Sequence, residues 1–111
     1  MKYQILHKDD VKNLTNGTFR VGTLNQVTYR ELLNIFGPPT YYPEDSGDGK
    51  VKFEWVLFNG KEAFTVYDYK TYDEDYTRNE LTTWSVGGKT DPSDVTRQIY
   101  KAINEVNTEA L

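Results

Sequence analysis

Apolar and charged positions alternate most clearly along residues 51–58. The odd positions of this segment are all apolar, whereas the even positions begin with a lysine and a glutamate. A period of two residues is typical of a β-strand with one buried face. The pair Asn59-Gly60 follows it and predicts a type I′ turn, because both residue types tolerate a positive φ. Residues 62–69 form the returning strand, so the pattern predicts a β-hairpin.

A helix is predicted to begin directly after Thr28. Thr28 and Glu31 have the spacing of a capping box, in which each side chain accepts a hydrogen bond from the backbone N–H of the other residue. Gly37 and the two prolines that follow it end the helix, because proline lacks an N–H and clashes with the preceding turn. The apolar residues at helical spacing are Tyr29, Leu32, Leu33 and Phe36.

Two further strands and a C-terminal helix complete the predicted elements. Residues 19–24 follow a turn-forming Asn-Gly pair, and residues 81–86 are rich in β-branched and aromatic types and end at a glycine pair. A helix is expected from Asp91-Pro92, because aspartate caps helices and proline fits the first helical position. Its predicted buried stripe is Val95, Ile99, Ala102, Ile103 and Val106, and we expect fraying after residue 106.

These elements follow one another in the order β-α-β-β-β-α. Strands are thus segregated from helices along the chain, which favours an α+β fold over a parallel sheet. We expect a single domain of residues 1–111, with an antiparallel sheet of three to four strands and two helices on one face. Residues 37–50 hold three of the four prolines and are predicted to form a mobile loop. The strand residues expected to face the helices are Phe53, Trp55, Leu57, Phe64, Val66 and Trp84.

The composition restricts the setting of the protein. Its 111 residues include no cysteine, which excludes a disulfide framework, a thiolate metal site and a cysteine nucleophile. The N-terminal residues lack the apolar run of a signal peptide, and no stretch approaches the roughly 18 apolar residues of a membrane span. We therefore expect a cytoplasmic protein without a membrane partner.

The net charge of −4 is unevenly distributed along the chain. Residues 1–40 carry a net charge of +2, whereas residues 41–76 hold four Lys/Arg and nine Asp/Glu, a net charge of −5. Direct binding to nucleic acid requires several phosphates to be neutralised by lysine and arginine, and the chain has no basic run. An acidic surface instead attracts a basic protein and repels DNA, RNA and anionic lipid.

Little in the sequence indicates catalysis. His7 is the single histidine and lies near a polar terminus, so neither a histidine metal site nor a serine–histidine pair is expected. The acidic stretches 44–49 and 73–75 lack the spacing of a calcium loop. Chance pairs among the 17 carboxylates could still support a hydrolase, and this alternative stays open. We predict no enzyme activity, no catalytic residue, no metal site and no cofactor.

Tyrosines and carboxylates are interleaved after the hairpin. Tyrosine offers a large, rigid contact area with a polar tip, and neighbouring carboxylates orient a basic partner. We predict an exposed acidic, tyrosine-rich surface that binds a basic surface of another protein. In the alternative interpretation the tyrosines pack on the sheet and the acids only solvate a loop. The predicted partner-binding residues are Tyr67, Asp68, Tyr69, Tyr72, Asp73, Glu74, Asp75 and Tyr76.

A second hypothesis places a small ligand near the end of the last strand. A glycine pair before a helix N-terminus can present backbone N–H groups to an anion, and an aromatic side chain can stack on a base. Under this hypothesis the protein is a homodimer that sequesters a nucleotide or cyclic-nucleotide signal. The ligand-binding residues would be Trp84, Gly87, Gly88 and Lys89.

An ordered series of short motifs between residues 28 and 88 resembles small uncharacterised open reading frames of bacteriophages and prophages. The motifs are Phe36-Gly37-Pro38, Asp48-Gly49-Lys50, Glu54-Trp55, residues 64–70 (FTVYDYK) and residues 84–88 (WSVGG). The resemblance implies a phage accessory protein in the cytoplasm of the bacterial host. Such proteins often inhibit a host defence or nucleic-acid-handling protein, and anti-CRISPR inhibitors of CRISPR nucleases are among them. The resemblance implies no catalytic residue in this chain.

Overall fold

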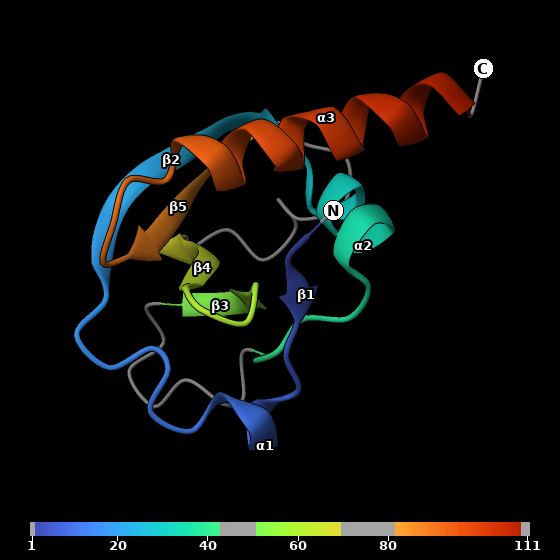
Figure 1. Cartoon of the computed structure of the whole chain (residues 1–111). Coiled ribbons are helices and arrows are strands. Elements are labelled where there is room, and N and C mark those ends of the chain that lie inside the picture. Colours follow the sequence, from blue (N-terminus) through green and yellow to red (C-terminus); the bar gives the residue numbers. More distant parts are fainter. Residues whose placement is uncertain (1, 43–50, 70–81, 110–111) are drawn as a thin grey trace.

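The computed structural model describes residues 2–42, 51–69 and 82–109 (Figure 1). These residues form one antiparallel sheet and three helices, which confirms the predicted α+β class. The strands are β1 (Gln4–Ile5), β2 (Phe19–Val27), β3 (Val51–Phe58), β4 (Ala63–Tyr69) and β5 (Thr82–Gly88), and their order in the sheet is β1-β3-β4-β5-β2. The helices are α1 (Lys8–Val11), α2 (Tyr29–Phe36) and α3 (Ser93–Glu109).

The sheet has one strand more, and the described chain one helix more, than the pattern predicted. The extra elements are β1, which has two residues, and α1, which has four. β1 pairs with the end of β3, where Gln4 lies opposite Phe58. Neither element is long enough to show a hydrophobic period, so both depend on contacts with residues far along the chain.

The buried hydroxyl of Thr40 extends the pairing at the outer edge of β3. The Leu6 N–H donates to the Val56 carbonyl at 2.9 Å. The Val56 N–H donates to the Oγ1 of Thr40 at 2.9 Å, and this hydroxyl donates to the Leu6 carbonyl at 2.8 Å. One side chain therefore bridges two backbone groups where the short β1 has ended.

The segment after α2 adds a further pairing on the same edge. Tyr41 and Glu54 exchange two backbone hydrogen bonds of 3.0 and 3.1 Å. Residues 37–42 of the predicted loop are therefore attached to the sheet. The rest of that loop, residues 43–50, lies outside the described residues.

The hairpin of β3 and β4 is confirmed, but its turn differs from the prediction. The Asn59 N–H donates to the Glu62 carbonyl at 3.2 Å, so Gly60 and Lys61 are the central residues of the turn. Gly60 has a φ of 93°, but neither Asn59 nor Lys61 has a positive φ, so the turn lacks the two successive positive φ angles of type I′. The Oδ1 of Asn59 accepts from the N–H groups of Lys61 and Glu62 at 2.9 and 2.7 Å. Asparagine thus stabilises the turn through its side chain.

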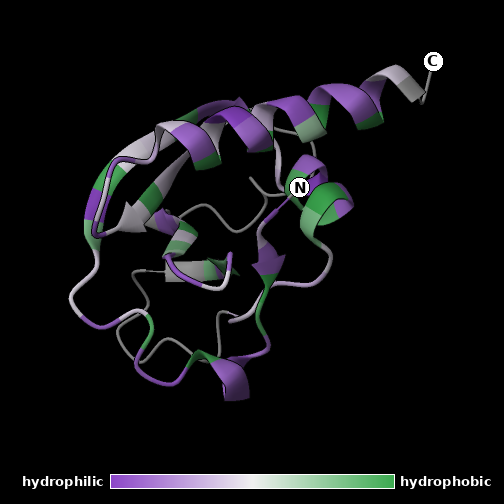
Figure 2. Ribbon diagram, viewed as in Figure 1, coloured by the Kyte–Doolittle hydropathy of each residue, from purple (hydrophilic) through white to green (hydrophobic). Residues whose placement is uncertain are grey.

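The two helices that were predicted cover one face of the sheet (Figure 1). At the start of α2, Thr28 and Glu31 form the expected capping box, with hydrogen bonds of 2.9 and 3.0 Å. α3 continues to Glu109, beyond the residue at which fraying was predicted. Its outer side is largely hydrophilic (Figure 2). None of the helices in the described part of the chain combines the length and the apolar character that crossing a membrane requires.

The main core lies between these helices and the sheet. Trp55 and Trp84 meet edge to face, with ring centroids 5.7 Å apart, and both are fully buried. Each indole N–H is satisfied, because Trp55 donates to the Gly37 carbonyl and Trp84 to the Val27 carbonyl, both at 3.0 Å. Other buried residues of this core include Leu24, Leu32, Leu57, Phe64, Val66, Val86, Val95, Ile99 and Ile103. The predicted inward residues are thus confirmed, with Phe53 partly buried at the edge.

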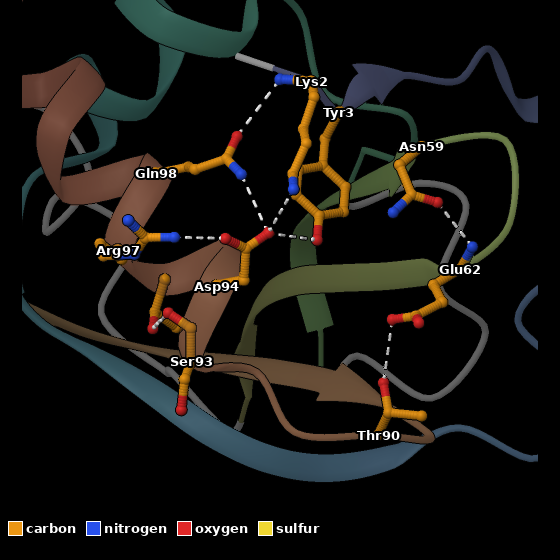
Figure 3. Close-up of polar contacts among 10 residues, drawn as sticks. Lys2, Tyr3, Asn59, Glu62, Thr90, Ser93, Asp94, Arg97 and Gln98 are labelled. Atoms are coloured by element: carbon orange, nitrogen blue, oxygen red, sulfur yellow. Dashed lines mark hydrogen bonds and ion pairs between the residues drawn. The ribbon is translucent and has the colours of Figure 1, made fainter.

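A carboxylate on α3 fastens the N-terminal segment to the fold (Figure 3). Asp94 accepts contacts of 3.2 Å from both the Lys2 ammonium and the Tyr3 hydroxyl. It also accepts hydrogen bonds from Arg97 at 2.6 Å and Gln98 at 2.9 Å. The hydrogen bond from Lys2 is the main reason that the pKa of Asp94 is lowered to about 2. Asp94 therefore stays ionised and holds the start of the chain against the helix.

A smaller core covers part of the opposite face, which we call the second face. Val56 points to this side, because its neighbours Trp55 and Leu57 belong to the main core. Leu6 and Val11 bury Val56, and Leu14, Tyr41 and Phe58 pack around them. This core covers the end of the sheet where α1 lies, and a groove is found beside it.

Candidate functional site

The groove has a volume of about 540 Å³ and lies on the second face. A hollow of this size is within the range of sites that hold small ligands. We call it the second-face groove. Its lining residues are Thr18, Phe19, Arg20, Glu54, Thr65, Tyr67 and Gly87.

Strand alternation explains why these residues meet. Phe64 and Val66 of β4 belong to the main core, so Thr65 and Tyr67 between and after them face the other way. Glu54 is the cross-strand partner of Tyr67 on β3. On the other side, β5 and β2 contribute residues to the same groove. The groove therefore crosses four neighbouring strands, β3, β4, β5 and β2.

Gly87 forms the floor of the groove because no larger residue fits there. A Cβ atom at this position would lie 2.5 Å from the Oγ1 of Thr65 and 3.4 Å from a ring carbon of Tyr67. The side chains of Thr65 and Tyr67 on β4 therefore lean over β5, and the lack of a side chain at Gly87 makes room for them. Gly87 lies opposite Thr65 on one side and Arg20 on the other.

Glu54 is the acidic group of the groove and is half-buried. Burial raises the pKa of Glu54 from 4.5 to about 7, and the negative charge of Asp68 adds to this increase. Among the described residues, no basic side chain lies within ion-pair distance of its carboxylate. Near neutral pH this group is therefore close to half-protonated, and it can accept or donate a hydrogen bond.

Asp68 is buried on the other face of β4, with only 1% of its surface exposed. Its Oδ1 accepts a hydrogen bond of 2.8 Å from the Phe53 N–H. The register of β3 against β4 shifts between Val51 and Glu54, so Asp68 satisfies a backbone donor beside an irregularity in the ladder. The negative charge of Asp68 contributes to the raised pKa of Glu54.

Arg20 forms the opposite wall, because it is the cross-strand partner of Gly87. The side chain of Arg20 is exposed, and none of the described carboxylates lies within ion-pair distance of it. Phe19 is 63% exposed, the largest value among the big apolar side chains that the structure describes. Phe19 is the partner of Gly88, which faces the main core, so its ring points to the helix side and its backbone carbonyl borders the groove, 3.7 Å from the Cβ position of Gly87. The exposed guanidinium of Arg20 offers an anion contact.

The predicted partner-binding residues are only partly described. Tyr67 is half-buried and lines the groove, whereas Asp68 is buried and cannot belong to an exposed acidic surface. Tyr69 ends β4. The remaining five residues of this predicted surface, Tyr72, Asp73, Glu74, Asp75 and Tyr76, lie outside the described residues.

The alternative ligand site is not assembled as predicted. Trp84 is fully buried in the main core, so its ring cannot stack on a ligand. Gly87 and Gly88 belong to β5 rather than to a helix N-terminus. A Cβ at Gly88 would lie 2.7 Å from the ring of Phe64, so this glycine permits close contact in the core. Lys89 is exposed after the strand, and only Gly87 lines the groove.

Phe19, Arg20, Glu54 and Thr65 were not selected from the sequence as site residues. The available signal was Glu54 itself, the one acidic residue of segment 51–58, in which every other residue except Lys52 is apolar. Comparison of the chain with protein-family models, curated proteins and solved structures finds no match. In the described part of the chain, no group of three or more His, Asp or Glu side chains is placed to hold a metal ion.

Proposed function

We propose that the protein is a non-enzymatic binding protein that docks one end of its sheet on a basic surface of another protein and inhibits it. This end of the sheet contains the first residue of β3 (Val51), the last residue of β4 (Tyr69) and the first residue of β5 (Thr82). Val51 and Tyr69 are paired across the hairpin, so these strand ends lie together. We call this the acidic end.

The distribution of charge about the acidic end is the observation that carries the proposal. Residues 43–50, which lead into β3, hold three carboxylates and one lysine. Residues 70–81, which connect β4 to β5, hold four carboxylates and two basic residues. Both acidic connections are attached to the same end of the sheet. Concentrated negative charge of this kind accelerates encounter with a basic partner and favours it over other surfaces.

The resemblance to phage open reading frames supports a more specific form of the proposal. In that setting the partner is a host protein that itself handles nucleic acid, such as a CRISPR nuclease, and whose basic groove normally holds phosphates. A row of carboxylates can occupy the same groove by presenting negative charge to the same lysines and arginines. Inhibition then needs no catalytic group in the inhibitor.

Capture from a bacterial lysate at low and at high salt tests the proposal. The bait is the full chain, and the retained protein is identified, purified and titrated against the wild type and against Asp73→Asn/Glu74→Gln/Asp75→Asn. We expect association to weaken at high salt, because exposed charges are screened. We also expect the triple variant to bind about tenfold more weakly or worse, since each exposed pair contributes up to about 1 kcal/mol.

A matched control separates the location of the charge from its amount. Asp9, Asp10 and Glu105 are exposed on α1 and α3, and their replacement by amides changes the net charge by the same three units. This control variant should bind almost as well as the wild type. Equal binding by both triple variants, or binding that salt does not affect, contradicts the proposal.

A further inference from the structure

Only two asparagines of the chain, Asn16 and Asn59, are directly followed by glycine. A glycine has no side chain to shield its backbone N–H from the asparagine before it. We propose that Asn16 is a site of spontaneous deamidation in the folded protein, promoted by the ammonium of Lys89, and that the hairpin turn protects Asn59 from the same reaction. This modification is independent of the proposed inhibition.

Deamidation needs only water as a co-reactant. The backbone nitrogen of the glycine loses its proton and attacks the Cγ of the asparagine, which closes an imide ring. The side-chain nitrogen takes up a proton from water and leaves as ammonia. Water then opens the ring at either carbonyl carbon, so the product is aspartate or isoaspartate, and the main chain of isoaspartate is one atom longer. An intramolecular attack of this kind is fast where the two groups can reach the correct orientation.

The carboxamide of Asn16 can take up that orientation. Asn16 and Gly17 are both exposed in the connection between α1 and β2. Among the described residues, the side chain of Asn16 has one hydrogen bond, from its Nδ2 to the Oδ1 of Asn13, with a length of 3.3 Å. The Gly17 N–H donates to no group in the described part of the chain. The carboxamide can therefore turn its face toward this nitrogen without losing a strong hydrogen bond.

A cation lies beside Gly17. The Cε of Lys89 is 3.6 Å from the position that a Cβ atom would take at Gly17, and the ammonium is one bond further along the side chain. Lys89 is exposed, and none of the described carboxylates forms an ion pair with it. A positive charge here favours loss of the Gly17 proton and stabilises the negative charge that develops on the Oδ1 of Asn16 during the attack. It also attracts the carboxylate of the product.

The carboxamide of Asn59 is held in place by the turn. Its Oδ1 accepts hydrogen bonds from the N–H groups of Lys61 at 2.9 Å and of Glu62 at 2.7 Å, the second of which is drawn in Figure 3. The Asn59 N–H donates to the Glu62 carbonyl at 3.2 Å, so the backbone is held as well. Attack on a carbonyl carbon comes from above the plane of the carboxamide, and the two hydrogen bonds oppose the rotation that this approach requires. Asn59 should therefore react more slowly, although Gly60 is also exposed.

Incubation of the full chain at about pH 8.5, followed by proteolysis and mass spectrometry, tests the inference. Each converted peptide gains about 1 Da, and fragmentation of its main chain distinguishes isoaspartate from aspartate. We expect Asn16 to convert about tenfold faster than Asn59, because the carboxamide of Asn59 must first lose two hydrogen bonds. In concentrated urea the two rates should become similar, because both Asn-Gly pairs are then unfolded.

A matched pair of variants tests the role of the ammonium. Lys89→Gln should slow the conversion of Asn16 about threefold at low salt, since an exposed charge contributes up to about this factor. Lys101→Gln removes an exposed charge on α3 and should leave the rate unchanged. The conversion of Asn59 serves as the internal reference in both variants.

Three results would overturn the inference. The first is that Asn16 stays intact in the folded protein, which would show that the fold protects it. The second is that Asn16 and Asn59 convert at the same rate in the folded protein, which would show that the turn gives no protection. The third is that Lys89→Gln and Lys101→Gln convert Asn16 equally fast, which would remove Lys89 from the reaction.

Discussion

Replacement of Glu54 by glutamine should stabilise the protein, and the gain should grow with pH. The carboxyl group is half-buried in the second-face groove, and burial raises its pKa to about 7 from an ordinary value of 4.5. The folded state therefore binds this proton more tightly than the unfolded state does. Stability from this group is complete below pH 4.5 and is lost as pH rises through 7. Glutamine has nearly the same shape and carries no charge at any pH.

The size of the effect follows from the two pKa values. A pKa difference of one unit corresponds to about 1.36 kcal/mol, so a rise from 4.5 to about 7 costs the wild type on the order of 3 kcal/mol once Glu54 is fully ionised. At pH 5 the unfolded carboxyl group is only partly ionised, and the cost is about 1 kcal/mol. Glu54→Gln should therefore gain about 2–3 kcal/mol more at pH 8.5 than at pH 5, relative to the wild type.

Urea unfolding of both proteins at these two pH values measures the difference directly. Glu105→Gln is the control, because Glu105 is exposed on α3 and its replacement should change stability little at either pH. At each pH the free energy of unfolding of the wild type is subtracted from that of the variant. The change in this difference between pH 5 and pH 8.5 is decisive, because the contributions of the other titrating groups are the same in both proteins and cancel. The reasoning is refuted if this difference is the same at both pH values, or if the variant is the less stable protein at pH 8.5.

Three other predictions concern the surroundings of this group and the rest of the fold. Asp68→Asn keeps an acceptor oxygen for the Phe53 N–H and removes a charge near Glu54. The pKa of Glu54, followed by NMR of its carboxyl carbon, should therefore fall but stay above 4.5. An unchanged pKa would mean that Asp68 has no electrostatic effect on Glu54. Asp94 has a pKa lowered to about 2, so its contribution is present above pH 3.8 and is lost as pH falls toward 2. The unfolding temperature of Asp94→Asn should thus be below that of the wild type at pH 7, and the gap should close near pH 2. Gly87→Ala should lower the free energy of unfolding by about 1–3 kcal/mol because its Cβ meets the Oγ1 of Thr65, and Thr65→Ala in the same chain should restore part of this loss.

The elements with strong local signals could be predicted from the sequence. The capping box at Thr28 and Glu31 lies within four residues, and the alternation of β3 and β4 lies within a single hairpin. Such signals depend on neighbours along the chain, so they can be recognised before the fold is known. The fold class, the helix-facing residues and the boundaries of α2 followed from them.

The edge of β3 could not be predicted, because distant residues create it. β1 is a strand only by virtue of its pairing with Phe58 and Leu57. Thr40 lies in a segment that reads as a proline-rich loop, and its hydroxyl becomes a sheet partner only when Leu6 and Val56 approach it. A two-residue strand and a single hydroxyl have no period, so no pattern in the sequence indicates them.

The position of Asp68 could have been read from the alternation itself. Phe64 and Val66 face the helices, and Asp68 follows them at the same spacing, so the period of two places it inward. Interpreting Asp68 as part of an acidic run gave more weight to composition than to periodicity. The same period shows that Trp84 shares a face with Val86, which assigns it to the core.

The ionised carboxylate of Glu54 lowers the stability of the fold, which indicates that the groove has a function. A penalty on the order of 3 kcal/mol is a large fraction of the 5–15 kcal/mol that stabilises a typical domain. Groups with perturbed pKa values concentrate at binding and catalytic sites, and structural ion pairs, the usual alternative, are not formed by Glu54 within the described residues. If a ligand of the groove hydrogen-bonds to Glu54, Glu54→Gln should gain stability at high pH and lose affinity for that ligand in the same molecule.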